Sequence, residues 1–69
     1  MSVIHHGQYS ITVVKVATDQ WRADIRRLDG RTIKTVGGPE QDVVEMHVRF
    51  SIDEAVEEAK RAIDGGGMS

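Results

Sequence analysis

The chain has 69 residues, a formal net charge of −2 and no cysteine. A chain of this length has room for one domain with a thin core, and the lack of cysteine excludes disulfides and most structural metal sites, which leaves a second subunit as support. The charge disfavours nucleic-acid binding through bulk electrostatics, and no segment approaches the ~20 apolar residues that span a bilayer.

The two ends of the chain lack the pattern of regular structure. Residues 1–8 (MSVIHHGQ) show no sustained hydrophobic period, and residues 65–69 (GGGMS) are rich in glycine. We therefore predict a flexible N-terminus over 1–8, one domain over 9–64 and a flexible tail over 65–69. The N-terminus also lacks the basic and apolar runs of a secretion signal, and the absence of cysteine fits a reducing compartment, so we expect a cytoplasmic protein.

The first predicted strand, 9–17, is dense in β-branched residues and carries apolar side chains on both of its faces. If Val14 and Val16 pack inward, an apolar strip remains on the uncovered face, and the reverse choice exposes the two valines instead. In either case the strip needs a cover, and a second copy of the chain is the simplest supplier. The candidate dimer surface consists of Tyr9, Ile11 and Val13.

The second predicted strand, Gln20 to Leu28, alternates cleanly between apolar and polar residues. Its apolar side carries Trp21, Ala23 and Ile25. Arginines and an aspartate occupy the other side. This pattern is typical of a strand with one buried face.

A glycine turn after this strand predicts a hairpin, for which two loop lengths compete. A two-residue loop would place Ile25 opposite Lys34 and mix the two faces. A three-residue loop that ends at a left-handed Gly30 places Ile25 opposite Ile33 and Asp24 opposite Lys34. We adopt this second register, which gives a third strand after the turn.

The segment 37–42 (GGPEQD) is a loop by composition, and 43–50 follows as the most regular strand in the chain. Alternate residues of this strand are apolar, so we expect one of its faces in the core. That face carries Val44, Met46, Val48 and Phe50.

A helix is predicted over about 52–64. Ser51 and Glu54 have the spacing of a capping box, and apolar residues then recur at helical spacing. Gly65 suits the left-handed position that ends many helices. The buried stripe is predicted to contain Ile52, Ala55, Val56, Ala59 and Ile63. The predicted fold class is therefore α+β: a four-stranded antiparallel meander (β-β-β-β-α) with one C-terminal helix packed on one face.

No catalytic or metal-binding arrangement stands out, and we expect neither an enzyme nor a cofactor. His5 and His6 are adjacent on an extended segment and so point apart, while His47 falls on the polar side of its strand. The first two turns of the helix carry four carboxylates, whose positions fit the first helical turn and a solvated face. These are Asp53, Glu54, Glu57 and Glu58.

Basic residues gather in the predicted hairpin of an otherwise acidic protein. In the adopted register, Arg22, Arg26 and Lys34 share a polar sheet face, and such asymmetry can mark a site for nucleic acid or an acidic partner. A solvated face is the favoured interpretation, because single-strand RNA platforms need aromatic residues among the cations and Trp21 is assigned inward. The candidate binding patch consists of Arg22, Arg26, Arg31 and Lys34.

Two segments resemble known families. Trp21 to Ile33 (WRADIRRLDGRTI) is similar to the hairpin of small bacterial YegP-like domains, with a tryptophan, an aliphatic residue four positions on, an [ND]-G turn and a further aliphatic residue. That family has no established role, so the resemblance implies no activity. Ser51 to Asp64 (SIDEAVEEAKRAID) is similar to the first helix of HicB-type antitoxins, which neutralise a small ribonuclease partner.

These observations lead to a functional hypothesis. We expect a small bacterial-type protein-interaction module that homodimerises, either antitoxin-like or a subunit of a larger assembly, with an unidentified protein as a further partner. The alternative is a nucleic-acid-binding domain that uses the basic hairpin face. The two differ in whether the apolar strip is covered by a partner chain or the arginines form one continuous patch.

Overall fold

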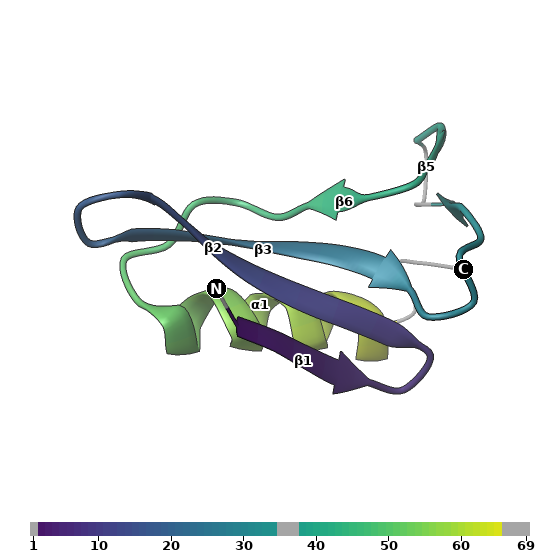
Figure 1. The fold of residues 1–69 in the computed structure, drawn as a ribbon, viewed down its shortest axis with the longest axis horizontal. Coiled ribbons are helices and arrows are strands. Elements are labelled where there is room, and N and C mark those ends of the chain that lie inside the picture. Colours follow the sequence, from purple (N-terminus) through teal and green to yellow (C-terminus); the bar gives the residue numbers. More distant parts are fainter. Residues whose placement is uncertain (1, 35–37, 66–69) are drawn as a thin grey trace.

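The computed structural model describes residues 2–34 and 38–65. Six strands and one helix follow in chain order (Figure 1). They are β1 (Ser2–His6), β2 (Tyr9–Ala17), β3 (Gln20–Arg27), β4 (Ile33–Lys34), β5 (Glu40–Gln41), β6 (Val44–Glu45) and α1 (Ile52–Asp64).

The main sheet is antiparallel with the strand order β1-β2-β3-β6, and α1 packs on one of its faces. The predicted fold class, a four-stranded antiparallel sheet with one helix, is therefore confirmed at this level. The meander differs in detail, because the strand after the β3 turn leaves the sheet. That strand, β4, pairs with β5 in a separate two-stranded sheet, and β6 takes its expected place beside β3.

The adopted hairpin register is accordingly wrong, although Gly30 has the expected left-handed backbone, with φ +78°. Ile25 lies opposite Val44 and not Ile33, and Asp24 lies opposite Glu45. The predicted register was chosen from pairs within the hairpin alone. Val44 offers Ile25 an apolar neighbour of equal quality from further along the chain, and Ile33 is fully buried without joining the sheet.

The N-terminus forms a strand that the sequence analysis missed. Residues 1–8 were predicted to lie outside the domain. Instead, β1 pairs with β2 over its whole length, from Ser2 opposite Val13 to His6 opposite Tyr9. The loop between the two strands has only two residues, and Gly7 occupies its first position with φ +62°. Glycine at this position suits a tight hairpin turn whose twist matches that of the strands. Residues 66–69 of the predicted tail lie outside the described residues.

Strands β2 and β3 form the centre of the sheet; β2 matches its predicted bounds, and β3 ends one residue before the predicted Leu28. Side chains that face α1 from these strands are buried, and so are three residues of the helix. The core consists of Ile11, Val13, Ala23, Ile25, Ile33, Ala55, Val56 and Ala59. Alanines on the helix allow it to approach the sheet closely.

Helix α1 begins and ends as predicted. The Ser51 hydroxyl accepts a hydrogen bond from the Glu54 amide at 3.1 Å, which satisfies one of the free N–H groups of the first turn. Two details differ from the prediction. Ile52, the first residue of the helix, is exposed, and Gly65 has a right-handed backbone, with φ −75°.

The segment 43–50 runs alongside β3, but only its β6 part is a regular strand. Beyond β6, the Met46 amide donates to the Ala23 carbonyl at 2.9 Å, and Trp21 and Arg49 exchange backbone hydrogen bonds of 2.8 and 2.7 Å. The irregular stretch between these contacts interrupts the alternation. Val48 and Phe50, which the sequence pattern assigns to the core, are therefore 47% and 74% exposed.

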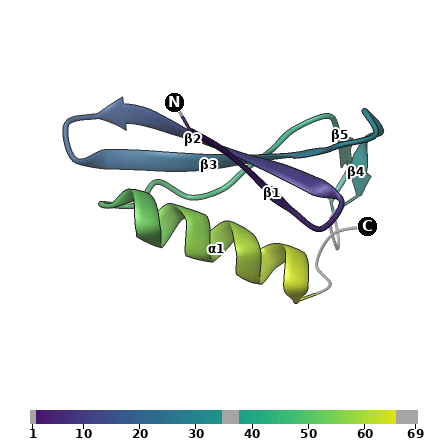
Figure 2. The same cartoon turned by 60° about the horizontal axis from the view of Figure 1, so that its bottom comes forward.

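The sheet has one covered and one uncovered face. Figure 2 shows α1 beneath the sheet, and no other element of the described chain lies against the opposite side. Because opposite residues in a ladder point to the same side, the register assigns the side chains of this surface, which we call the open face. The open face consists of Val3, His5, Ser10, Thr12, Val14, Arg22, Asp24, Arg26 and Glu45.

Candidate functional site

The centre of the open face is an ion-pair network on β3 and β6. Arg22 Nε donates to Asp24 Oδ1 at 2.8 Å, and Arg22 Nη2 lies 3.0 Å from Glu45 Oε2. The hydrogen bond to Asp24, opposed in part by burial, raises the pKa of Arg22 above its ordinary value. Asp24 is only 7% exposed, and its charge is matched by the Arg22 guanidinium. Arg22 therefore offers little unmatched positive charge to a ligand.

The predicted basic patch divides between two sheets. Arg22 and Arg26 lie on the open face of β3, whereas Lys34 lies on β4, in the two-stranded sheet. Arg31 lies in the loop before β4, where its amide donates to Asp29 Oδ1 at 3.0 Å. Arg26 is exposed and forms no ion pair with any residue in the described ranges. The shared polar face that the hairpin register predicts for Arg22, Arg26 and Lys34 is thus not formed by β3 and β4.

The predicted dimer surface faces the wrong way. Ile11 and Val13 are buried between the sheet and α1, and Tyr9 packs partly against the same core. The reverse orientation of β2, which the sequence analysis left open, is the one that forms. It places Val14 on the open face, where it is half-buried.

The uncovered side of the sheet ends at a free strand edge. Val3 of β1 is 57% exposed, and β1 pairs with β2 alone among the described strands. Figure 1 shows β1 as the outermost strand, with β6 at the opposite edge. Sequence reasoning missed this edge because adjacent Val3 and Ile4 break the alternation of the N-terminus. The available signal was Gly7, which lies between the apolar pair Val3-Ile4 and the next strand.

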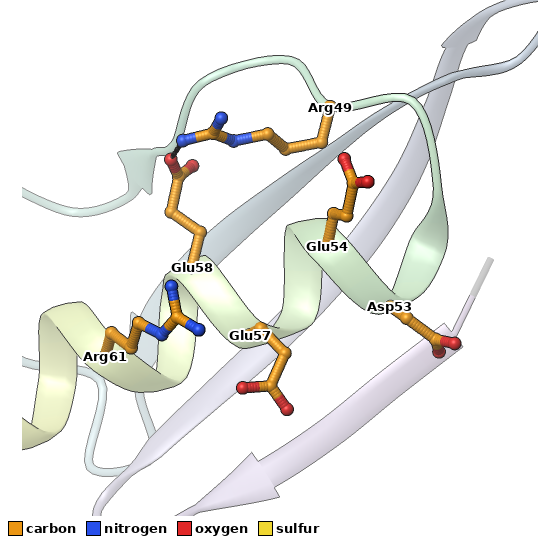
Figure 3. Close-up of a pocket in the computed structure, with 6 residues that line it drawn as sticks. All are labelled: Arg49, Asp53, Glu54, Glu57, Glu58 and Arg61. Atoms are coloured by element: carbon orange, nitrogen blue, oxygen red, sulfur yellow. Dashed lines mark hydrogen bonds and ion pairs between the residues drawn. The ribbon is translucent and has the colours of Figure 1, made fainter.

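A second surface feature lies where α1 meets the segment before it. A hollow of about 470 Å³ is lined by side chains from both, and Figure 3 shows them. They are Arg49, Asp53, Glu54, Glu57, Glu58 and Arg61.

One carboxylate of this hollow, Glu58, is paired within the chain. Glu58 binds the Arg49 guanidinium and also accepts a hydrogen bond from the His47 amide at 3.1 Å. The contact with Arg49 holds the pKa of Glu58 below its ordinary value, so this carboxylate is a poor proton donor. The carboxylates of Glu54 and Glu57 point in different directions in Figure 3. Acid-base catalysis by a pair of carboxylates needs groups that converge, and these two do not. The contact between Glu58 and Arg49 instead tethers α1 to the segment before it.

The three histidines lie in different places. His5 is on the open face, His6 Nε2 lies 2.9 Å from Asp64 Oδ1 at the end of α1, and His47 Nδ1 lies 3.6 Å from Glu58 Oε2. Within the described ranges, no group of three or more potential metal-binding side chains comes together. The contact between His6 and Asp64 links β1 to the end of α1.

The chain matches no known family model, no curated protein and no solved structure. The resemblances to YegP-like domains and HicB-type antitoxins accordingly stay predictions from two segments. No helix in the described part of the chain is both long and apolar enough to cross a membrane.

Proposed function

We propose that this chain is a non-enzymatic protein-interaction module that homodimerises at the β1 side of its sheet. The observation that carries the proposal is the free margin of that side. It combines an exposed apolar residue, Val3, with an outer strand that has no partner on its far side among the described residues. The role is that of an antitoxin-like subunit or a component of a larger assembly.

The charge distribution supports association at this margin. Three ionic groups of the open face, Arg22, Asp24 and Glu45, pair with one another on β3 and β6, away from β1. β1 itself contains no lysine, arginine, aspartate or glutamate. Two copies can therefore approach along β1 without repulsion between like charges.

Light scattering over a concentration series tests this proposal. The weight-average mass is expected to rise from that of the 7.7 kDa monomer towards twice that value as the concentration approaches about 1 mM. Val3→Lys places a charge at the margin and is expected to shift the rise to higher concentration. Val48→Lys is the matched control, because Val48 is also exposed but follows β6, at the other edge of the sheet. A constant monomer mass for the unmodified chain contradicts the proposal.

Nucleic-acid binding is a second candidate, and one observation favours it. Arg26 is an exposed cation on the open face without an ion pair in the described chain. A single such arginine accounts for a weak, salt-sensitive contact with phosphate. Filter binding or fluorescence anisotropy with single-stranded and double-stranded DNA at low salt tests this, and Arg26→Glu is expected to abolish any binding. Binding that survives this substitution contradicts a role for the open face.

A further inference from the structure

We propose that the homodimer forms by antiparallel pairing of β1 with β1 of a second copy, in the register that places Ile4 opposite Ile4. This inference rests on the proposed homodimer and adds its partner surface, geometry and register. It follows from three features of β1: an unprotected edge, the direction of its free backbone groups, and the partial burial of Ile4.

The edge formed by β1 has none of the features that usually prevent strand addition. Natural edge strands are blunted by lysine, proline, bulges or very short length. β1 contains no lysine or proline, and its pairing with β2 runs without a register shift. The opposite edge is different, since β6 has only two residues and the chain beyond it is irregular. A partner strand therefore fits β1 and not β6.

The hairpin turn determines which backbone groups of β1 point outward. A two-residue loop makes the flanking pair, His6 and Tyr9, the hydrogen-bonded kind, and the two kinds of pair alternate along the ladder. Ile4 then directs its N–H and C=O towards β2. Val3 and His5 direct theirs towards the free edge.

These outward groups are complementary to a second copy of themselves. When β1 pairs antiparallel with its copy about Ile4, Val3 of each chain lies opposite His5 of the other. Both are residues with outward N–H and C=O groups, so each of the two pairs is a hydrogen-bonded pair. Ile4 then forms the central non-hydrogen-bonded pair with its copy, where side chains are closest. Occupancy by a second copy thus satisfies the backbone groups of the edge in a closed, two-fold arrangement.

The side chains support the same register. Ile4 points to the α1 side and is only partly buried against the core, so contact with Ile4 of the copy would continue the core across the junction. On the open face, Val3 would lie beside the imidazole of His5 from the copy. Helix α1 packs mainly on β2 and β3. The two-fold axis would be perpendicular to the joined eight-stranded sheet, with both helices on one side.

The size of this contact predicts its strength. Five residues of strand pairing bury well under the roughly 1,200 Å² of a stable complex. The dimer is therefore expected to be weak, with a micromolar or higher dissociation constant. It would form at high local concentration or beside another binding event. Concentrations up to about 1 mM are therefore needed to populate it.

Single cysteines test the register directly, because the chain has none of its own. Opposite Cβ atoms in a non-hydrogen-bonded pair lie near the ~4 Å that a disulfide needs. Ile4→Cys is therefore expected to form a disulfide-linked dimer in a glutathione redox buffer. Val3→Cys is the matched control, because the two copies of residue 3 are offset along the strands, and it is expected to cross-link at least about tenfold less. Equal cross-linking of both variants overturns the register.

Two measurements remain decisive if Ile4→Cys fails to fold. Val3→Pro removes an outward N–H that the monomer does not use, and it is expected to raise the dimer dissociation constant about tenfold or more, whereas Val3→Thr keeps that N–H and is expected to change it only slightly. In the unmodified chain, hydrogen exchange at the Val3 and His5 amides is expected to slow as the concentration rises. An unchanged dissociation constant for Val3→Pro, or concentration-independent exchange, overturns the edge pairing. If a dimer still forms in those cases, the homodimer proposal stands and only its geometry is wrong; a monomer at all concentrations removes both.

Discussion

Gly7 shows at the residue scale why a short N-terminal segment joins the sheet. Its φ of +62° lies in the left-handed region that other residues adopt at a cost of roughly 1–2 kcal/mol. A Cβ atom placed there would meet no atom within 4 Å, so a side chain is resisted by the backbone conformation alone. The turn that creates β1 thus depends on one residue.

Substitution of Gly7 by alanine tests this dependence. We expect Gly7→Ala to lower the free energy of unfolding by about 1 kcal/mol, and Gly7→Asn to lower it by less, because asparagine tolerates the left-handed region better. Urea denaturation followed by circular dichroism measures both. A stabilised Gly7→Ala protein would contradict the left-handed turn, since alanine stabilises only where the native backbone suits it.

The Glu58 carboxylate provides a second test at this scale, through pH. Arg49 lowers the folded-state pKa of Glu58 below its ordinary value of 4.5, so this contact stabilises the protein above that pH. The stabilisation is lost as the pH falls through the folded-state pKa. Glu58→Gln is expected to cost about 1 kcal/mol at pH 7 and to reduce the loss of stability below pH about 4.5. Glu57→Gln is the control, because Glu57 forms no ion pair in the described chain. An unchanged acid limb for Glu58→Gln would contradict the tether.

At the element scale, the sequence predicts what is decided locally. The bounds of α1 follow from the Ser51 cap and the spacing of Ala55 and Ala59, which all act within a few turns of one another. The bounds of β2 and β3 follow from β-branched density and clean alternation. The choice of partner for β3 is different, because it compares a near strand with a distant one. Only the assembled core shows that Val44 lies beside Ile25 while Ile33 fills space outside the sheet.

The same distinction explains what was predictable of the candidate site. The outward direction of Arg22 and Arg26 follows from the alternation of β3 and is confirmed. The ion pair of Arg22 with Asp24 joins two residues on the same side of one strand, whereas the predicted basic patch included Arg22 and left out Asp24. The edge of β1 was not predictable from period, because a five-residue strand with adjacent apolar residues has too little pattern.

Phe50 gives the sharpest test at the element scale. Its place in the alternating pattern predicts a core residue, whose truncation would cost 3–5 kcal/mol. In the structure it is 74% exposed, where the chain leaves the sheet to enter α1. We therefore expect Phe50→Ala to change the free energy of unfolding by about 0.5 kcal/mol or less, whereas Ile33→Ala, at a fully buried site, costs roughly 2–4 kcal/mol. Equal large losses for both would place Phe50 in the core.

At the scale of the whole molecule, the surface area bears on whether folding needs a partner. The accessible surface of 4510 Å² is close to the roughly 4,300 Å² expected for a compact monomer of 7.7 kDa. An obligate dimer cut in half would expose an extensive additional apolar surface. The proposed association through β1 would therefore add to a monomer that already buries its own core, although that core is small.

This leads to a prediction about the isolated chain. At a few micromolar, where a weak dimer has dissociated, the protein is expected to unfold in a single cooperative transition, with a stability of roughly 3–10 kcal/mol for its length. Because partner binding stabilises only by mass action, Tm is expected to rise by no more than a few degrees between about 5 and 500 µM. Differential scanning calorimetry at the two concentrations measures this. A large rise in Tm, or an unfolded chain at the lower concentration, would show that the second copy is required for folding, and β1 would then be a structural strand of an obligate dimer.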